Sequence, residues 1–458
     1  MSASSHSMST DVLIVGGGFT GMAAAAALAR SGRRVHVYEA AQTTDPRFRG
    51  ELIHPRGVRG LSELGLGDEL FRRGGVAVKG FAVTPKGGVG AMVLPYAAEQ
   101  GPGLGMDHHQ LVLTLRAQVA ARKNVRITTG TRVDALIVHD ARVVGVRTAG
   151  GDEHFADLVV VADGRQSKLR AQLGLEPEVK LLSHTIAFGV EGELPEGRFG
   201  HVFLGGPGPI LAYPYGDGLI RFCVDVPLGA AKGREGLLKF LRERALPAVA
   251  PSLREPMLRS LEATPFEGCA NHSISTTACA APGVVLVGDA GGCAHPLTAS
   301  GMTNAINDVL TLSKALADAG GEPTDEALGR YQRERYDFIR MRELFTHSLY
   351  EVFRAADDGA AALQDGVFRY WGGARGRRVS MNILSGEEVR VSRFVAEYTR
   401  VFQRSAVVVL AQLARNPGRG TAQLQRLART TAARMGDAVG RTARKVLERY
   451  RLDLHELG

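Results

Sequence analysis

The strongest constraint on the fold is a glycine pattern at the start of the chain. The stretch "DVLIVGGGFTGMAAAAALARSGRRVHVYEA" begins with a short apolar strand, passes through Gly16-x-Gly18-x-x-Gly21 and continues as an alanine-rich helix. A second strand then ends at Glu39, 18 residues after Gly21. Glycines at this spacing allow a tight turn, the approach of a pyrophosphate and close packing of helix on strand, and the acid binds a ribose hydroxyl. The stretch therefore predicts a Rossmann-like unit that binds a dinucleotide.

Two further strands end at an acid next to a glycine. In "ADLVVVADGRQSKLR" the strand ends at Asp163, with Ser167 and Arg170 on the following turn. In "VGDAGGCAHPLTASGMTNAINDVL" the strand ends at Gly288 and Asp289. The first pair, taken alone, is typical of an ordinary turn. A strand-end carboxylate can also accept a hydrogen bond from a ribose or ribitol hydroxyl, and small residues let the backbone lie against a flat ring.

The helix expected from about Gly301 indicates which dinucleotide fits best. The N–H groups at its start can point at a ring system that gains negative charge on reduction. Small side chains precede this helix start over a long passage, which leaves room for such a ring. The passage therefore favours a flavin over a nicotinamide.

The order of these motifs predicts the fold class. We expect an α/β (α+β) fold with a Rossmann-like FAD-binding domain, an interleaved β-sheet substrate domain and a C-terminal helical region. With 458 residues the chain is long enough for two or three packed units. The expected ranges are 1–80, 108–181 and 276–324 for the FAD-binding domain, 81–107 and 182–275 for the substrate domain, and 325–458 for the helical domain.

Charge and cysteine usage indicate the environment of the protein. The formal net charge is +9, and ten Lys or Arg against four Asp or Glu from Arg415 to the end place +6 of it in the tail. A basic tail favours an anionic surface or is a solvated helix, and both interpretations stay open. The four cysteines show neither C-x-x-C nor metal-ligand spacing, and the first residues show no export signal, so we expect a cytoplasmic protein without a metal. No nucleic-acid-binding module is recognisable.

The three strand-end motifs occur in the order found in flavoprotein monooxygenases that resemble p-hydroxybenzoate hydroxylase in fold. A narrower resemblance is to squalene epoxidases (squalene monooxygenases). The stretch "HPLTASGMT" is similar to their HPLTGGGMT, "GELIHPRG" resembles GELLQPGG, and "DHHQLVLTLR" resembles HHGRFIMSLR. Counterparts exist also for "PILAYPYGDGLIRFCVDVP" and "LYEVFRAADD", so the resemblance covers roughly residues 11–373.

The resemblance implies which residues contact the flavin and the substrate. Together with the motif residues, the implied cofactor site comprises Gly16, Gly18, Phe19, Thr20, Gly21, Glu39, Arg47, Arg116, Val133, Asp163, Gly288, Asp289, Gly301 and Met302. The implied apolar substrate pocket comprises Phe81, Tyr213, Pro296, Leu297, Phe353, Phe368 and Trp371. For the last three of these, core packing of a helical domain is the alternative interpretation.

Two pocket positions depart from the family. Phe81 stands where a tyrosine is usual, so the hydrogen bond of that tyrosine is missing. Trp371 replaces a smaller aromatic residue, which predicts a shorter pocket. Both departures bear on the identity of the substrate.

The activity implied by the resemblance is epoxidation of an alkene in a lipophilic isoprenoid, with O₂ activated as a flavin hydroperoxide. Squalene going to 2,3-oxidosqualene, a step of sterol biosynthesis, is the first expectation, and a prenylated aromatic or other terpenoid intermediate is the alternative. The flavin supplies the chemistry, so we assign no catalytic side chain. His295 is a candidate proton donor, although a structural histidine is the commoner role.

The resemblance also implies the electron source, whereas the location is inferred from the sequence itself. The sequence has no second glycine fingerprint for NADPH, so NADPH is expected to act indirectly, through a separate flavin or ferredoxin-type reductase. The basic C-terminal helices suggest peripheral contact with the inner face of the membrane as an alternative to a purely cytoplasmic location.

Three other functions compete with epoxidation. A geranylgeranyl-type reductase carries a similar flavin motif, although "HPLT…GMT" favours epoxidation. A flavin halogenase needs a W-x-W-x-I-P signature, which a chain whose one tryptophan is Trp371 cannot contain. A non-catalytic prenyl-lipid binder would not need Glu39, Arg47, Asp163 and Asp289, all of which are present.

Overall fold

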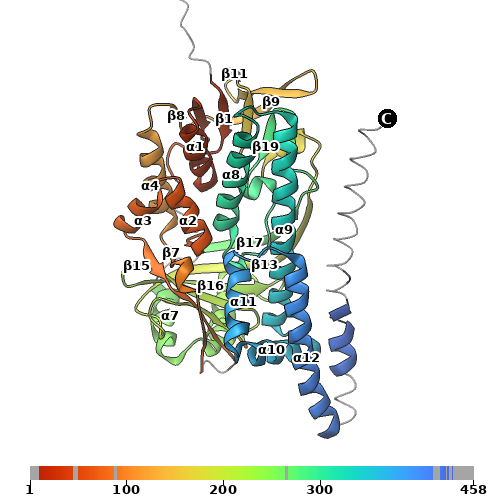
Figure 1. The fold of residues 1–458 in the computed structure, drawn as a ribbon. Coiled ribbons are helices and arrows are strands. Elements are labelled where there is room, and N and C mark those ends of the chain that lie inside the picture. Colours follow the sequence, from red (N-terminus) through yellow and green to blue (C-terminus); the bar gives the residue numbers. More distant parts are fainter. Residues whose placement is uncertain are drawn as a thin grey trace, which may run out of the picture.

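The computed structural model describes residues 10–44, 50–86, 90–263, 267–415, 423–429, 431–432 and 436. Within these residues the chain has the expected mixed α/β architecture, with a six-stranded sheet at one end, a seven-stranded sheet at the other and helices alongside both (Figure 1). Most of the basic tail after Arg415 lies outside the described residues, so its role stays a prediction.

The six-stranded sheet is built from segments far apart in the sequence. In spatial order its strands are β18 (Ala280–Ala281), β19 (Val284–Leu286), β12 (Leu158–Val161), β1 (Val12–Val15), β2 (Val35–Tyr38) and β8 (Val125–Thr128). All neighbours are parallel except β18 and β19. The central strands are short apolar runs because both faces of a parallel sheet are covered. Their carboxyl ends therefore share one edge of the sheet.

Three helices cover this sheet and form one core with it. They are α1 (Phe19–Arg30), α4 (His108–Ala120) and α8 (Gly301–Asp318). The alanine run of α1 is buried along its length, because small side chains let the helix approach the neighbouring strand and helices closely. The strands and helices predicted around the three motifs are thereby confirmed, with shifts of one to three residues at their ends.

The seven-stranded sheet separates two apolar cores. In spatial order it contains β17 (Glu267–Ser275), β13 (Glu178–Glu191), β16 (Leu219–Pro227), β15 (Ile210–Gly216), β14 (Gly200–Phe203), β5 (Gly80–Thr84) and β6 (Met92–Pro95). Alternate residues of β15 face opposite sides. Ile210 and Ala212 join the core under α6 (Gly233–Phe240) and α7 (Pro251–Ala263), whereas Leu211 and Tyr213 join the core under the C-terminal helices.

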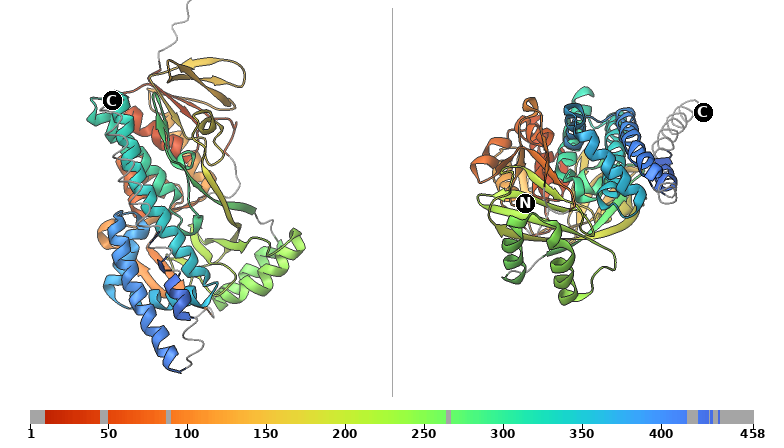
Figure 2. Two further views of the ribbon diagram at one scale, coloured as in Figure 1. Left: turned by 90° about the vertical axis from the view of Figure 1, so that its right-hand side faces the viewer. Right: turned by 90° about the horizontal axis from the view of Figure 1, so that it is seen from below.

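The C-terminal part of the described chain is helical, as predicted. Its helices are α9 (Asp325–Arg354), α10 (Asp358–Trp371), α11 (Ala374–Ser385) and α12 (Val391–Arg415). The 30 residues of α9 give it a length of about 45 Å. It starts beside the six-stranded sheet and ends among α10, α11 and α12 (Figures 1 and 2). One rigid element therefore joins the two ends of the molecule.

The remaining elements are short. They are two three-stranded sheets, β11 (Glu153–Phe155), β10 (Arg142–Thr148), β9 (Val133–His139) and β3 (Leu52–Ile53), β7 (Gly103–Gly105), β4 (Val76–Val78); the helices α2 (Pro55–Glu63), α3 (Gly67–Arg72) and α5 (Lys168–Gln172); and the single turns η1 (Ala98–Gln100), η2 (Leu241–Ala245), η3 (Leu246–Ala248), η4 (Gly288–Gly291) and η5 (Pro296–Thr298).

Replacing Phe222 by alanine should destabilise the protein by about 3–5 kcal/mol, because this fully buried ring on β16 would leave a cavity. The ring stacks on Phe188 with 5.7 Å between centroids. The control is Leu219→Ala on the same strand, where the side chain is 37% exposed and the cost should stay within about 0.5 kcal/mol. Urea unfolding measures both. Equal midpoints for the two variants would contradict the assignment of Phe222 to this core.

Candidate active site

The glycine turn after β1 combines crowded and open positions. Gly16 has a φ of 102°, and a Cβ there would lie 2.4 Å from the Ala162 carbonyl oxygen. A Cβ on Gly21 would lie 1.8 Å from the Gly16 carbonyl oxygen. A Cβ on Gly18 would meet no atom within 4 Å. The turn is therefore closed by two of its glycines and open at the third, at the start of α1.

Glu39 and Arg116 meet at this turn. The Glu39 carboxylate accepts hydrogen bonds from the N–H groups of Gly17 and Ala41, at 2.6 and 2.8 Å. The Arg116 Nε donates to the Gly17 carbonyl oxygen at 2.8 Å, and its guanidinium lies 3.4 Å from the Glu39 carboxylate. The acid at the end of β2 is thus held at the turn that it was expected to serve.

The other two motif acids also lie at carboxyl ends of strands in the same sheet. Asp163 follows β12 and is exposed, and Asp289 follows β19 with 42% of its side chain exposed. The Arg165 Nε lies 3.9 Å from Asp289. Arg170 connects the two turns, since its guanidinium donates to the Ala290 carbonyl oxygen at 2.8 Å. The motifs therefore meet at one edge, where open α/β sheets bind ligands.

A buried ion pair that the sequence analysis missed holds the turn at Gly288. The Asp308 carboxylate on α8 accepts from the Gly288 N–H and from the Arg335 Nε on α9, both at 2.9 Å. The guanidinium of Arg335 also donates to the Gly288 carbonyl oxygen at 3.3 Å. Burial alone would lower the pKa of Arg335, but the adjacent Asp308 outweighs it and raises that pKa. An acid on the apolar face of the expected helix was the available signal for Asp308, whereas its partner 27 residues later had none.

The start of α8 is open toward the same edge. A Cβ on Gly301 would meet no atom within 4 Å, and no side chain caps the helix at Ser300. Met302 is buried close to Gly50. The remaining expected contacts are Phe19, buried in α1; Thr20, half-buried beside Gly288; Val133, half-buried at the start of β9; and Arg47, which lies outside the described residues.

These features fit FAD. Two helix starts, those of α1 and α8, leave glycine positions open at Gly18 and Gly301, where phosphates or an electron-rich ring can approach. Two carboxylates at strand ends remain accessible to hydroxyl groups. Among the described residues, no group of three or more His, Cys, Asp or Glu is placed to hold a metal ion.

An apolar cavity of about 110 Å³ lies between the seven-stranded sheet and the C-terminal helices. The sheet and η5 provide Phe81, Val83, Leu94, Val202, Leu297 and Thr298; α9 provides Phe345, Ser348, Leu349, Val352 and Phe353; and α10, α11 and α12 provide Val367, Tyr370, Trp371, Ser380, Met381, Ile383, Leu384, Phe394, Glu397, Tyr398 and Val401. Hydrocarbon and aromatic side chains dominate this lining.

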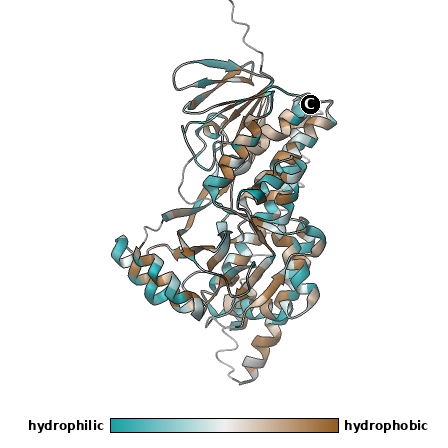
Figure 3. Cartoon of the chain, turned by 90° about the vertical axis from the view of Figure 1, so that its left-hand side faces the viewer, coloured by the Kyte–Doolittle hydropathy of each residue, from teal (hydrophilic) through white to brown (hydrophobic). Residues whose placement is uncertain are grey.

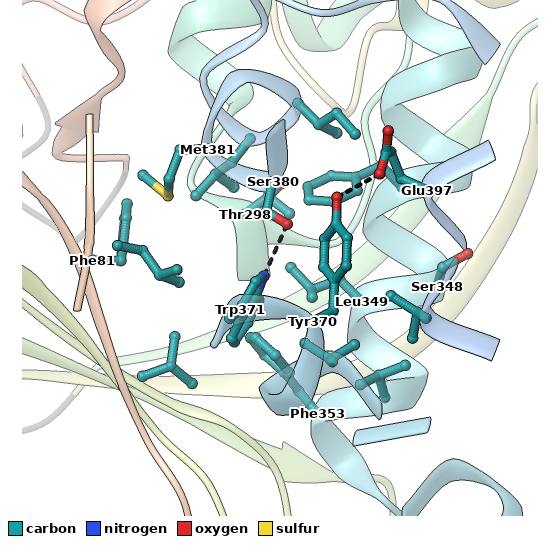
Figure 4. Close-up of a pocket in the computed structure, with 18 of the residues that line it drawn as sticks. Phe81, Thr298, Ser348, Leu349, Phe353, Tyr370, Trp371, Ser380, Met381 and Glu397 are labelled. Atoms are coloured by element: carbon teal, nitrogen blue, oxygen red, sulfur yellow. Dashed lines mark hydrogen bonds between the residues drawn. The ribbon is translucent and has the colours of Figure 1, made fainter. Parts of the chain in front are cut away.

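Two pairs of polar groups in the lining bond to each other. The Trp371 Nε1 donates to the Ser380 Oγ at 2.8 Å, and the Tyr370 hydroxyl donates to the Glu397 carboxylate at 2.5 Å (Figure 4). Burial, reinforced by that bond, raises the pKa of Tyr370 and keeps its hydroxyl protonated. The cavity therefore suits an apolar ligand.

Four of the seven expected pocket residues line this cavity: Phe81, Leu297, Phe353 and Trp371. The other three lie outside its lining. Pro296 is exposed at the start of η5, and Phe368 packs against the Trp371 ring with 5.6 Å between centroids. Tyr213 is buried on β15, where its hydroxyl donates to Glu51 at 3.4 Å. Glu51 itself forms a buried two-bond pair with Arg221, which the sequence analysis also missed.

Comparison with known proteins gives one family. The family model for squalene epoxidase matches residues 155–416, and that for an NAD(P)-binding Rossmann-like domain matches residues 14–70. The chain is 34% identical over 376 residues to squalene epoxidase 2, mitochondrial, of Arabidopsis thaliana, covering 79% of this chain and 64% of that protein. It is 32% identical over 381 residues to the squalene epoxidase of Aspergillus fumigatus, covering 79% of each.

Solved structures with a similar fold include PqsL of Pseudomonas aeruginosa, described as a probable FAD-dependent monooxygenase. PqsL of P. aeruginosa, in complex with 2-aminobenzoylacetate, matches with a TM-score of 0.66 and 26% identity, covering 76% of this chain and 97% of PqsL. The p-nitrophenol 4-monooxygenase PnpA of Pseudomonas putida matches with a TM-score of 0.71 over 83% of this chain and 99% of PnpA, and its 20% identity shows the fold alone.

Replacing Gly18 by alanine should weaken FAD binding by about tenfold or more, equal to about 1.4 kcal/mol, without destabilising the apoprotein. Gly18 has a φ of −79°, which alanine adopts freely, and the new methyl group would enter the open space expected for the pyrophosphate. Gly21→Ala is the contrast, because its Cβ would overlap the turn and lower the melting temperature even without FAD. FAD titration and thermal unfolding separate the two effects. Unchanged FAD affinity in G18A would contradict the placement of the pyrophosphate next to Gly18.

Replacing Arg335 by methionine should cost about 3–5 kcal/mol of stability, because the buried Asp308 carboxylate would lose its counter-charge. The control on the same helix is Arg330→Met, whose partly exposed ion pair with Asp318 should contribute at most about 1 kcal/mol. Both are measured by urea unfolding. If R335M unfolded at the wild-type urea concentration, the buried pair would not stabilise the turn.

Proposed function

This chain belongs to the squalene epoxidase family, and from that membership we propose that it is an FAD-dependent monooxygenase that epoxidises an alkene of a lipophilic isoprenoid. Squalene going to 2,3-oxidosqualene is the first candidate reaction. The chain spans 64% of the length of the Arabidopsis relative and 79% of the Aspergillus one, so the activity and substrate of the whole relatives are proposals for this chain.

One observation carries the proposal. One short segment, residues 288–300, belongs both to the turn at which we expect the flavin and to the lining of the apolar cavity. Asp289 lies in η4 at its start, and Leu297 and Thr298 of η5 line the cavity. The same segment leads directly into α8, whose open start is at Gly301. An alkene in the cavity would therefore lie next to the ring of a flavin bound at this edge.

The residues that we propose for FAD are those of the three turns. Gly18 would receive the pyrophosphate at the start of α1, in a turn that Gly16 and Gly21 close, and Glu39 beside Arg116 would accept a hydrogen bond from a ribose hydroxyl. Asp163 and Asp289 would accept from the ribitol and ribose hydroxyls. Phe19, Thr20, Val133, Gly288, Gly301 and Met302 complete the proposed set, and Arg47 stays a prediction outside the described residues. The strands at this edge come from the three proposed segments of the FAD-binding domain, residues 1–80, 108–181 and 276–324.

FAD, when bound, would supply the activation of O₂ and the transfer of one oxygen atom to the alkene. The side chains of the cavity would orient the alkene and exclude water. For epoxidation by a flavin these two tasks matter more than a catalytic acid or base. A cavity of about 110 Å³ is of the order of the roughly 150 Å³ cavity that binds benzene. We therefore place the reacting end of an isoprenoid in this cavity, with the rest of the chain reaching beyond it.

A prenylated aromatic or other terpenoid is the second candidate substrate. It is favoured by Phe81, which lines the cavity without the hydroxyl of the tyrosine usual in the family, and by the Tyr370–Glu397 pair, which offers one polar contact. Electrons would come from NADPH through a separate reductase.

Peripheral contact with a lipid surface is proposed through α12. No helix in the described part of the chain is long and apolar enough to cross a membrane. On α12, whose projecting end is coloured as hydrophobic in Figure 3, Val407 is 65% and Leu410 is 51% exposed, and Arg404 lies on the same helix. A basic helix with exposed apolar residues binds at the surface of an anionic bilayer.

The test is to purify the protein, record its visible spectrum and incubate it with squalene, FAD, NADPH and a generic reductase, reading products by mass spectrometry. We expect a flavin spectrum and the gain of one oxygen atom on squalene. Val367→Trp fills the cavity from α10 and should reduce product by roughly tenfold or more at unchanged flavin content. Val138→Trp, at an exposed position of β9 away from the cavity, is the matched control and should keep wild-type activity.

The other outcomes separate the competing functions. Oxygen on a prenylated aromatic, with squalene untouched, would select the second substrate. Two added hydrogen atoms on the alkene would show a reductase. A protein that stays colourless after FAD is added would overturn the enzyme proposal and leave a prenyl-lipid binder.

A further inference from the structure

Two buried histidines hold the segment that joins the flavin turn to the cavity. The segment runs from His295 to Ser300, and its Leu297 and Thr298 line the cavity. Ala299 within it has a φ of 47°, a left-handed conformation that a residue with a Cβ adopts only when its surroundings impose it. The contacts that impose it come from both sides.

On one side, His295 joins the segment to a buried carboxylate. Its Nδ1 accepts from the Leu297 N–H at 3.1 Å, so the proton of the neutral ring is on Nε2. That Nε2 lies 3.0 Å from the Ser183 Oγ and 3.3 Å from Asp225. Ser183 donates to the same Asp225.

Besides Ser183 and His295, the carboxylate of Asp225 on β16 contacts groups from α9 and β17. Tyr350 of α9 donates to it at 2.9 Å and stacks on the His295 ring with 4.1 Å between centroids. Burial and the neighbouring Asp225 raise the pKa of Tyr350 to about 12, which keeps this donor protonated. Asn271 of β17 lies 3.4 Å from the carboxylate. Although a serine, a histidine and an aspartate meet here, Ser183 donates to the acid rather than to a base, so the group is not a nucleophilic triad.

On the other side, His54 holds Thr298. Its Nε2 donates to the Thr298 carbonyl oxygen at 2.8 Å, and its Nδ1 therefore accepts from the Tyr96 hydroxyl at 2.6 Å. Its backbone N–H donates to the Thr303 Oγ1 at 3.0 Å. The ring has no exposed surface, and burial lowers the pKa of His54 to about 3, so it is neutral at working pH.

Both rings use both of their nitrogens inside the protein. Neither His54 nor His295 therefore has a nitrogen left to give a proton to a ligand or to take one from it. We propose that His54 and His295 are positioning residues, which hold residues 296–300 as the wall of the cavity nearest the flavin and thereby couple oxygen use to product. The contacts stand by themselves, and the effect on coupling rests on the proposed function.

The test compares four variants as flavin-loaded protein. His54→Leu and His295→Leu remove the hydrogen bonds, whereas His54→Gln and His295→Gln can restore one donor and one acceptor each. His201→Leu is the control, because His201 is equally buried but lies with Phe203 on the other face of the seven-stranded sheet. The first measurement needs no substrate. Trp371 is the single tryptophan of the chain, lines the cavity and is 4% exposed, so acrylamide quenching of its fluorescence reports whether the wall is closed.

We expect quenching to rise in both leucine variants and to stay at the wild-type level in both glutamine variants and in H201L. The second measurement is product formed per NADPH consumed, with hydrogen peroxide as the other fate of the electrons. This ratio should fall by roughly tenfold or more in the leucine variants and recover in the glutamine variants.

Wild-type quenching and coupling in the leucine variants would overturn the proposal. Glutamine variants as poor as the leucine variants would overturn it too, because the imidazole itself would then be required. If a leucine variant fails to fold, its glutamine variant still decides between these outcomes. If the wild-type protein converts no alkene, the proposed function fails while the quenching measurement still decides whether the histidines close the wall.

Discussion

The ion pair between Asp308 and Arg335 is the interaction on which both halves of the site depend. It joins α8 to α9. Asp308 accepts a hydrogen bond from the Gly288 N–H, and Arg335 donates one to the Gly288 carbonyl oxygen. The helix that carries Arg335 also presents Ser348 and Phe353 to the cavity. A shift of this pair would therefore move the expected flavin turn and the cavity lining together. Removing two charges from water costs free energy of folding. The short contact between Asp308 and Arg335, together with their hydrogen bonds to the Gly288 backbone, offsets that cost.

The cavity stays apolar because the polar groups around it are satisfied elsewhere. Tyr370 donates to Glu397, Trp371 to Ser380, and Tyr96 to His54. An unpaired buried donor would cost about 1–3 kcal/mol and would attract water. Water in the cavity would promote loss of the activated oxygen as hydrogen peroxide before it reached an alkene. Pairing in the surrounding shell therefore serves both stability and the proposed chemistry.

Much of the fold was predictable, because three stretches of sequence each contain a strand and the turn that follows it. These are the stretches around Gly16, Asp163 and Asp289. The glycines at 16, 18 and 21 and the acids at 39, 163 and 289 lie at strand ends, where sequence alone indicates the environment. The pairs Asp308–Arg335 and Glu51–Arg221 were missed, since each joins residues far apart whose proximity only tertiary packing creates. The same limit applies to the residues that line the cavity. Leu297 could be inferred from its motif. That Tyr213 and Phe368 do not line the cavity could not be inferred, because it depends on their tertiary contacts with Glu51 and Trp371.

The replacement of a family tyrosine by Phe81 does not leave the region without a hydrogen-bonded phenol. Phe81 packs near His54 and Tyr96, with centroids 6.0 and 6.5 Å away, and it is Tyr96 that donates to His54. The phenol of Tyr96 is thus buried, and its hydrogen bond supports residues 296–300 through His54 and Thr298 and is not directed into the cavity. On the cavity side only the Phe81 ring is presented. Phe81 therefore gives the ligand only apolar contact while the wall keeps its support through Tyr96 and His54, so the choice between the two candidate substrates depends on the rest of the cavity lining.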